Sequence, residues 1–392
     1  MLENLSQLPA PAKEALNHSN KLLGLIKQEI LQQNNVISFA RYMELALYAP
    51  GLGYYSAGSQ KFGKQGDFVT APEISPLFSR CLARQCQQVL ELLEGGDILE
   101  VGAGSGVMAA DLLLELERLA CLPQQYFILE VSAELQQRQQ QNLQQLIPHL
   151  YNRIHWLSAW PVKPLQGVIL ANEVLDAMPV HLFALENDDM WELGVAWRDE
   201  KLVLEKMVLS DLVFSRSVSQ LRTDILSEVS YYQSELNLWL YSWLSSLNKI
   251  LAKGLILLID YGFARAEYYH PDRSMGTLMC HYRHYAHSDP FWLPGLQDIT
   301  AHVDFTAVAE AGYEAGLQVS GYTSQAAFLL ACGLLTLAAS NKPLVEQLQT
   351  SQQIQKLTAS HEMGELFKLI ALTKEFEQPL IGFSLQDWRI RL

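Results

Sequence analysis

The chain has 392 residues, a length that allows two or three domains, or one large domain with additions. Hydrophobic residues make up 49% and charged residues 18%, so the composition excludes widespread disorder. The net charge of −14 argues against non-specific nucleic-acid binding, which depends on neutralising phosphates, whereas an acidic surface would attract a cationic substrate.

The amino-terminal part contains two predicted amphipathic helices, over residues 12–33 and 38–48, the second opened by a serine cap. Residues 49–73 follow, with five glycines, two prolines and four aromatic residues. A loop of this length in a compact domain is usually functional or disordered, and its aromatic content argues against disorder. Helix resumes over residues 75–93.

Strands and helices then alternate. Short Val/Ile/Leu-rich runs separated by helices predict a parallel sheet covered on both faces, and therefore an α/β fold. The predicted strands are residues 97–101, 126–131, 154–157, 167–171 and 255–260, and the predicted helices are residues 108–120, 133–146 and 227–251. The glutamine-rich residues 136–145 are typical of a solvated helix face.

More than eighty residues separate the fourth strand from the fifth, although a crossover needs only a dozen or more. The excess, residues 180–226, alternates apolar and polar residues around a turn-like Arg-Asp-Glu and predicts a β-rich insertion. From Phe305 onward the sequence predicts mostly helix. We divide the chain into an amino-terminal arm and loop (1–80), a core with the insertion (81–335) and a helical carboxyl-terminal extension (336–392).

The chain carries no clear targeting or membrane signal. Five cysteines without a CxxC pair argue against a disulfide framework. The amino terminus resembles neither a signal peptide nor an Arg-rich transit peptide, and the longest apolar stretch, residues 326–339, falls short of the ~20 residues of a membrane span and predicts a buried helix. We expect a cytoplasmic protein without a membrane span; the sequence indicates no oligomeric state.

A glycine-rich turn follows the first strand, with the sequence Glu-Val-Gly-Ala-Gly-Ser-Gly over residues 100–106. Glycines permit a tight turn and close approach of a ligand to the backbone, and the helix start adds unpaired N–H groups. The spacing and the preceding acid differ from the dinucleotide pattern GxGxxG and are typical of an S-adenosylmethionine (SAM) pocket. The structural alternative is tight strand–helix packing. We assign to the cofactor Glu100, Gly102, Gly104 and Gly106.

Glu130 ends the second strand, 24 residues beyond the last glycine of the turn. A carboxylate at this place can accept hydrogen bonds from both ribose hydroxyls, as in other doubly wound nucleotide sites. The alternative is a solvated glutamate at a strand end. The order of glycine turn, next strand and terminal acid favours a cofactor role.

The fourth strand ends in Asn172 and Glu173, and Asp176 follows three residues later. Ligands of α/β sheets bind at the carboxyl ends of the strands. Two carboxylates there can bind a guanidinium group and draw its charge away from one nitrogen, which makes that nitrogen a better nucleophile toward the methyl group of SAM. We assign Asn172 to the cofactor and both acids to catalysis; the alternative is that the acids cap a helix.

A histidine-rich segment occurs late in the chain, with His281, His284, His287 and His302. The spacing of three could indicate a metal site, but no acidic or cysteine ligand set accompanies it. We expect ordinary hydrogen-bonding or substrate-loop residues here and assign no metal.

With these motifs in place, the sequence resembles the MidA family of SAM-dependent methyltransferases, which includes the mitochondrial complex I assembly-factor arginine methyltransferase. The resembling stretches spread over most of residues 40–335; they are Met43–Ser56, Gly66–Phe78, Leu99–Gly106, Tyr126–Glu134, Ala171–Val180, Ile259–Gly262 and Tyr268–Phe305.

The resemblance implies a class I (Rossmann-like) methyltransferase core that binds SAM. It implies that Gly66, Asp67 and Phe68 approach the cofactor from the amino-terminal loop, and that His302 occupies a place like the His-containing loop of arginine methyltransferases, a third catalytic residue. It also implies symmetric dimethylation of an arginine in a protein, a subunit of respiratory complex I.

Three hypotheses of function follow. The leading one is a protein arginine N-methyltransferase. A small-molecule methyltransferase is the second, because Tyr54, Tyr55 and Phe62 could enclose a flat ligand. The third is a SAM-binding assembly factor for a respiratory complex, since a fold alone does not determine a function.

Overall fold

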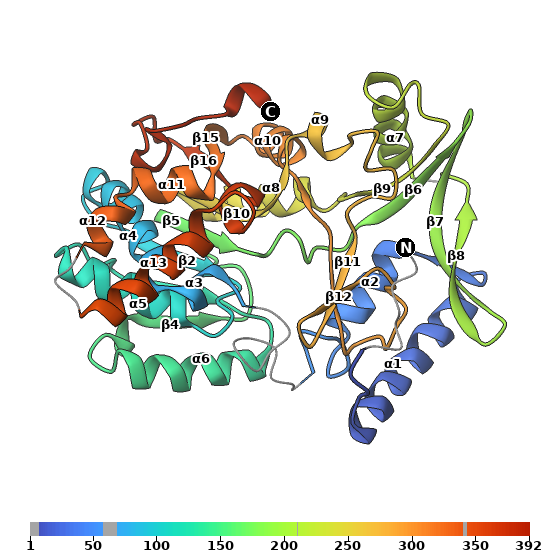
Figure 1. Cartoon of the computed structure of the whole chain (residues 1–392), viewed down its shortest axis with the longest axis horizontal. Coiled ribbons are helices and arrows are strands. Elements are labelled where there is room, and N and C mark those ends of the chain that lie inside the picture. The colour runs from blue at the N-terminus through green and yellow to red at the C-terminus, as the bar shows by residue number, and fades with distance from the viewer. Residues whose placement is uncertain (1–7, 58–68, 210, 340–342) are drawn as a thin grey trace. The chain divides into compact units, whose positions relative to one another are not determined.

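The computed structural model describes residues 8–57, 69–209, 211–339 and 343–392 (Figure 1). The chain divides into two compact units that interleave along the sequence. The first unit comprises the described part of residues 1–68 together with Leu175–Trp239 and Arg265–His302. The second unit comprises Val69–Val174, Leu240–Ala264 and the described part of residues 303–392.

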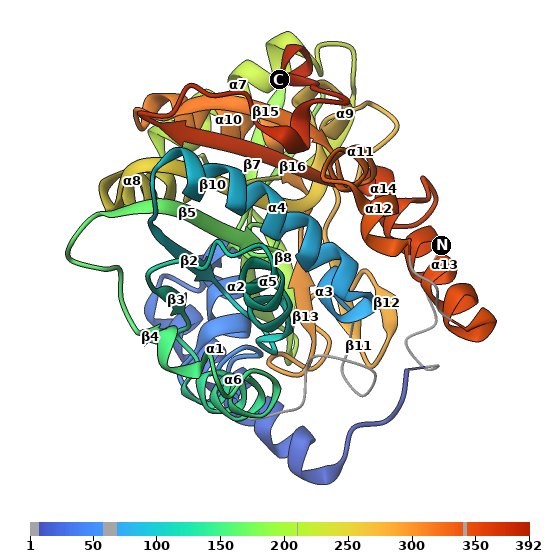
Figure 2. The same cartoon turned by 90° about the vertical axis from the view of Figure 1, so that its left-hand side faces the viewer.

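A mixed sheet forms the centre of the second unit, and it contains the parallel strands that the sequence predicts. Its strands lie in the order β15-β16-β10-β5-β2-β3-β4 (Figures 1 and 2). The parallel strands predicted from the sequence are β2 (Asp97–Val101), β3 (Tyr126–Leu129), β4 (Ile154–Leu157), β5 (Leu165–Asn172) and β10 (Leu251–Phe263). The chain runs outward from β2 to β4 and then returns to continue from β5 to β10. The strand order therefore reverses between β2 and β5, where ligands of open α/β sheets bind.

Helices cover both faces of this sheet. Val168 and Leu170 of β5 belong to one apolar cluster with residues of α4 (Pro76–Leu92) and α5 (Val107–Arg118). On the opposite face, a Cβ placed at Gly312 of α10 (Phe305–Glu314) would contact Leu372 at 3.1 Å. The helix α8 (Leu240–Ile250) packs against α10 and β10 on that face. The remaining helices between the strands are α3 (Ala71–Ile74), α6 (Ala133–Leu146) and the 3-10 helix η2 (Tyr151–Arg153).

The carboxyl-terminal part departs from the helical prediction. β15 (Gln318–Ser324) and β16 (Phe367–Lys374) join the sheet, and β16 runs antiparallel between β15 and β10. The strand β16 contributes Leu369 and Ala371 to the apolar cluster. Sheet pairing across more than a hundred residues overrides local helical pattern here, because the partner strand supplies the hydrogen bonds and the buried surface.

Helices do occur in this region. They are α11 (Gln325–Ala331), α12 (Leu334–Ala338), α13 (Leu344–Thr358), α14 (Met363–Leu366) and the 3-10 helices η3 (Ile381–Phe383) and η4 (Arg389–Arg391). The single buried helix expected over residues 326–339 is interrupted at Gly333, whose φ of +83° is left-handed. No helix in the described ranges is both long and apolar enough to cross a membrane.

The first unit contains the predicted β-rich insertion. Antiparallel strands pair in the order β1-β7-β6-β9, with β8 added on β7, and the β7–β8 hairpin turns at Asp199 and Glu200, as predicted. These strands are β1 (Val36–Ser38), β6 (His181–Glu186), β7 (Asp189–Arg198), β8 (Lys201–Met207) and β9 (Tyr231–Leu236).

The helix predicted over residues 227–251 is wrong in its first half. Residues Tyr231–Leu236 form β9 against β6, and only Leu240–Ile250 is helical. The paired tyrosines at the start of this segment suit a half-buried strand. The other helices of the first unit are α1 (Lys13–Gln32), α2 (Phe39–Tyr48), α7 (Leu212–Asp224) and α9 (Arg265–Tyr268).

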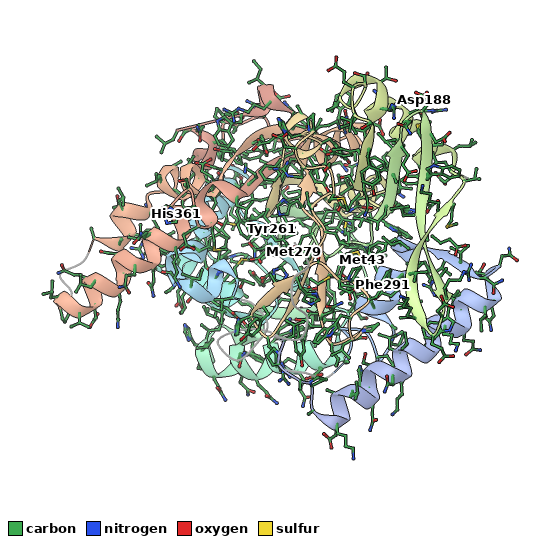
Figure 3. The ribbon with its side chains drawn as sticks, turned by 45° about the vertical axis from the view of Figure 1, so that its right-hand side comes forward. Met43, Asp188, Tyr261, Met279, Phe291 and His361 are labelled. Carbon is green, nitrogen blue, oxygen red and sulfur yellow. The ribbon has the colours of Figure 1, made fainter. Side chains whose placement is uncertain are left out.

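A smaller three-stranded sheet, β12-β11-β13, completes the first unit. Its strands are β11 (Met279–Tyr282), β12 (Tyr285–His287) and β13 (Asp298–Thr300). The short pair β14 (Val303–Asp304) with β10 belongs to the second unit. Met43 of α2 and Phe291 share one apolar cluster in the first unit, where Met43 is fully buried (Figure 3).

Candidate functional site

The glycine turn lies at the carboxyl end of β2, at the point where the strand order reverses. Gly102, Gly104 and Gly106 have φ of +71°, +53° and +82°, values that side-chain-bearing residues rarely adopt. Gly106 is the residue immediately before α5. A Cβ at Gly102 would also come within 3.2 Å of Val174 Cγ2, so packing contributes to the need for glycine there. The turn presents backbone rather than side chains, which suits a closely approaching ligand.

Glu100 is buried beside this turn and has a partner that the sequence did not reveal. The hydroxyl of Tyr126 donates a hydrogen bond to Glu100 Oε2 at 2.6 Å. Burial raises the pKa of Glu100 to about 7, the hydrogen bond from Tyr126 opposes this, and the charge of Glu130 adds to it. A contact between Glu100 and the cofactor stays a prediction.

Glu130, at the end of β3, is buried and held by the start of α6. The backbone N–H of Ser132 donates to Glu130 Oε1 at 2.9 Å, and Gln139 Nε2 donates to Glu130 Oε2 at 3.1 Å. The amide of Gln136 donates to the backbone oxygen of Glu130 at 2.6 Å. The carboxylate is therefore oriented by its own neighbourhood, as a ribose-binding acid would need to be.

The glutamine-rich helix face is not wholly solvated, contrary to the expectation from composition. Gln139 is fully buried, and its Nε2 also donates to the backbone oxygen of Gly104 at 3.1 Å. Its Oε1 accepts a hydrogen bond from Trp156 Nε1 at 3.0 Å. No sequence pattern separated this glutamine from its exposed neighbours, because only the spatial position of Gly104 and Trp156 gives it partners.

Asn172 is the last residue of β5 in the second unit, and Glu173 follows it. Glu173 has φ of +53°, a strained conformation for a residue with a side chain, and its N–H donates to Ile259 of β10 at 2.9 Å. Asn172 Nδ2 donates to Glu173 Oε1 at 3.1 Å. Within the described residues, the buried Asn172 Oδ1 accepts no hydrogen bond, so it suits a donor from a ligand.

Asp176 and His302 both lie in the first unit. Asp176 is buried, and its backbone oxygen accepts a hydrogen bond from the N–H of Ala301 at 3.0 Å, directly before His302. The N–H of His302 donates to Thr277 Oγ1 at 2.9 Å. The structure therefore brings the segments of these two predicted residues together, although 126 positions separate them in the sequence.

A tyrosine and a further buried acid accompany them. The hydroxyl of Tyr55 lies 3.0 Å from each carboxylate oxygen of Asp298 on β13. Burial raises the pKa of Tyr55 well above its usual value, and the charges of Asp298 and Asp176 raise it further. Tyr48 stacks on Tyr55 at a centroid distance of 5.5 Å. Asp298 carried no sequence signal of its own beyond the resembling stretch that contains it.

Other predicted residues do not converge on a site. Tyr54 is almost fully buried in the first unit's apolar core, which removes one member of the expected aromatic enclosure. His281 and His287 project to opposite sides of the β11–β12 hairpin, because Cys280, not His281, pairs with His287. Across the described ranges, no three His, Cys, Asp or Glu side chains are grouped to hold a metal ion. Four predicted residues lie outside the described part of the chain: Phe62, Gly66, Asp67 and Phe68.

Solved structures define the class. A protein from Burkholderia thailandensis bound to S-adenosyl-homocysteine matches with a TM-score of 0.94 and 42% identity, over 98% of this chain and 100% of that one. A second structure of a Burkholderia thailandensis protein matches with a TM-score of 0.91 and 41% identity, again over 98% and 100%. S-adenosyl-homocysteine is SAM without its methyl group. The predicted class I methyltransferase fold and its cofactor, SAM, are confirmed.

The family follows from a sequence model. Residues 81–323 match the model described as "Putative S-adenosyl-L-methionine-dependent methyltransferase". The match covers more than half of the chain, and the chain belongs to this family of SAM-dependent methyltransferases.

Curated relatives are more distant. The chain is 27% identical to the mitochondrial protein arginine methyltransferase NDUFAF7 of Danio rerio over 86% of this chain and 83% of that protein. It is 25% identical to the Homo sapiens protein of the same name, over 92% and 89%. These relatives are named as mitochondrial, which contradicts the cytoplasmic location expected from the sequence. That expectation rested on the composition of the amino-terminal residues, and the names of these relatives overturn it.

Proposed function

We propose that the protein transfers a methyl group from SAM to an arginine side chain of a protein substrate. Relatives that share 25–27% identity over most of the chain carry the name protein arginine methyltransferase. The observation that carries the proposal is the pair of acids Glu173 and Asp176, three residues apart after the strand β5. The net charge of −14 agrees with a cationic acceptor.

The chemistry asks little beyond alignment and charge. Bound SAM supplies an activated methyl group. A guanidinium nitrogen forms the new N–CH₃ bond as the S–CH₃ bond breaks, leaving S-adenosyl-homocysteine, and one N–H proton is released. A carboxylate that binds the guanidinium group concentrates its charge on the nitrogens that do not react, and from the sequence we assign this role to Glu173 and to Asp176. The imidazole of His302 is the group to which we assign the released proton.

The predicted cofactor residues that the structure describes all belong to the second unit. Glu130 would accept hydrogen bonds from the ribose, and the turn of Gly102, Gly104 and Gly106 would let the cofactor approach the backbone. The buried Asn172 Oδ1 would accept a hydrogen bond from a cofactor donor such as its ammonium group. The four cofactor positions in the turn and the three in the amino-terminal loop are expectations that a complex with S-adenosyl-homocysteine would test together.

The decisive experiment uses methyl-labelled SAM with a cell lysate. We expect one or a few labelled protein bands whose hydrolysate contains methylarginine, and Asp176→Ala should strongly reduce the label. No labelled protein while SAM binding is intact would overturn the proposal. Label confined to the low-mass fraction would instead support a small-molecule methyltransferase.

The degree of methylation and the target need a second measurement. The resemblance implies symmetric dimethylation of a respiratory complex I subunit. Mass spectrometry of complex I arginines from cells with and without the protein should show a dimethylated arginine that disappears. If the complex I arginines are unchanged while other proteins carry methyl label on arginine, the target is a different protein and the proposed arginine activity still holds.

A further inference from the structure

Gln139 connects two parts of the predicted cofactor site that lie in different loops. Its side-chain amide donates to the backbone oxygen of Gly104, in the glycine turn after β2, and to Glu130 Oε2, at the end of β3. Both distances are 3.1 Å, and the side chain is fully buried. An amide nitrogen has two hydrogens, so one glutamine can satisfy both acceptors at once.

The orientation of this amide follows from the chemistry of its third partner. The indole N–H of Trp156 is only a donor, and it lies 3.0 Å from Gln139 Oε1. An inverted amide would face its own N–H groups toward that indole and its oxygen toward the carboxylate of Glu130 and the carbonyl of Gly104. Every contact would then be repulsive, so Trp156 leaves the amide a single acceptable orientation.

A neighbouring contact on the same helix serves the turn alone. Asn142, one turn further along α6, donates from Nδ2 to the backbone oxygen of Ser105 at 3.0 Å. Gln139 and Asn142 therefore donate hydrogen bonds to the backbone oxygens of consecutive residues in the glycine turn, and only Gln139 also donates to Glu130. Asn142 contacts the glycine turn alone, whereas Gln139 connects the turn to Glu130.

We propose that Gln139, oriented by Trp156, is a positioning residue. Its two hydrogen bonds hold the Glu130 carboxylate and the glycine turn in the relative position that binding of the cofactor's ribose requires. The proposal rests on the assignment of Glu130 to the ribose hydroxyls. A neutral donor suits this place, because it holds the carboxylate without pairing it with a cation that would reduce its strength as an acceptor.

Calorimetry with two ligands tests the proposal, S-adenosyl-homocysteine and its 2′,3′-dideoxy analogue. Wild-type protein should bind the analogue at least ~30-fold more weakly, because a buried carboxylate loses both ribose partners. The variant Gln139→Met has a side chain of similar length without hydrogen-bonding N–H groups. It should weaken the binding of S-adenosyl-homocysteine by ~10-fold or more and the binding of the analogue by no more than ~3-fold. This loss of discrimination is a result that general loosening of the site would not produce.

Matched controls lie on the same helix. Gln141→Met changes an exposed glutamine and should leave both affinities unchanged. Asn142→Leu should weaken both ligands equally, because it releases the turn without touching Glu130. Trp156→Phe should reduce discrimination in the same direction as Gln139→Met, and it provides the test if the methionine variant fails to fold.

The outcomes separate the proposal from its premise. Equal binding of both ligands by wild-type protein would overturn the assignment of Glu130 to the ribose, and the proposal with it. If wild-type protein discriminates between the two ligands and Gln139→Met keeps the same ratio of affinities, the role of Gln139 alone is overturned. Trp156→Phe takes the place of Gln139→Met if the methionine variant does not fold.

Discussion

The two units build their candidate residues in different ways. In the second unit, two acids that we assign to the cofactor have side-chain partners from nearby in the chain: Gln139 lies 9 positions from Glu130, and Tyr126 lies 26 positions from Glu100. In the first unit, Tyr55 reaches across 243 positions to Asp298. The partners of these two acids are local in the sequence, whereas Tyr55 and Asp298 come from distant segments.

This difference has a functional meaning. A cofactor of constant structure can be bound by a turn and a few strand-end residues, so a short motif carries its recognition. Acceptors vary, and a site made of separate loops can change without disturbing the sheet. The comparison predicts that variants in the two units will separate SAM binding from methyl transfer.

The largest effect should come from the glycine turn. Gly104→Val puts a β-branched side chain at φ of +53° where the cofactor approaches, and calorimetry should show at least ~100-fold weaker SAM binding, equivalent to ~3 kcal/mol. Gly51→Val is the matched control in the first unit, also left-handed at +67°, and a Cβ there meets no described atom within 4 Å. Unchanged SAM affinity in Gly104→Val would remove the turn from the site.

The reciprocal variant is Asp176→Ala in the first unit. We expect turnover to fall by ~100-fold with SAM affinity within ~2-fold of wild type, because the acid orients the acceptor and not the cofactor. Asp188→Ala is the control, since Asp188 is a fully exposed acid at the turn between β6 and β7 of the same unit (Figure 3). Normal turnover of Asp176→Ala in a steady-state assay would withdraw the assignment.

A smaller effect concerns stability and pH. The pKa of Glu100 is raised from its ordinary value near 4.5 to about 7 in the folded protein, so the folded state holds a proton that the unfolded state has lost. Stability contributed by this proton is present at low pH and lost as pH rises toward 7. Between pH 5.5 and 7.5 the free energy of unfolding of wild type should fall by about 2 kcal/mol relative to that of Glu100→Gln.

Urea titrations of both proteins at the two pH values measure this difference. Parallel pH dependence of wild type and Glu100→Gln would show that Glu100 is ionised throughout. In that case the hydrogen bond from Tyr126 outweighs the desolvation of the carboxylate.

The mildest pair of variants makes the same change in each unit. Tyr126→Phe removes a buried hydroxyl and Tyr55→Phe removes a partly buried one, and each hydroxyl donates to a buried carboxylate. We expect each to cost ~1–2 kcal/mol of stability. Tyr126→Phe should weaken SAM binding by ~3–10-fold with the acceptor KM unchanged, and Tyr55→Phe should raise the acceptor KM by a similar factor with SAM binding unchanged. If both variants changed SAM binding and the acceptor KM in the same way, Tyr126 and Tyr55 would not serve different ligands.

The sequence by itself determined the α/β core, because burying a parallel strand on both faces demands a continuous apolar run that is visible residue by residue. It also located the glycine turn and the acid Glu130 at the ends of their strands, since both patterns are formed by residues adjacent in the chain. The insertion was recognisable for the same reason, through the alternation of β7 and β8 around their turn.

Tertiary structure alone decided the rest. β16 became an antiparallel strand between β15 and β10, and residues 231–236 became β9, because distant partners offered hydrogen bonds and buried surface that local propensity cannot anticipate. Gln139 looks like any residue of a solvated glutamine-rich face until Gly104, Glu130 and Trp156 surround it. A buried polar side chain takes its meaning from the groups that satisfy it, and folding is what brings those groups together.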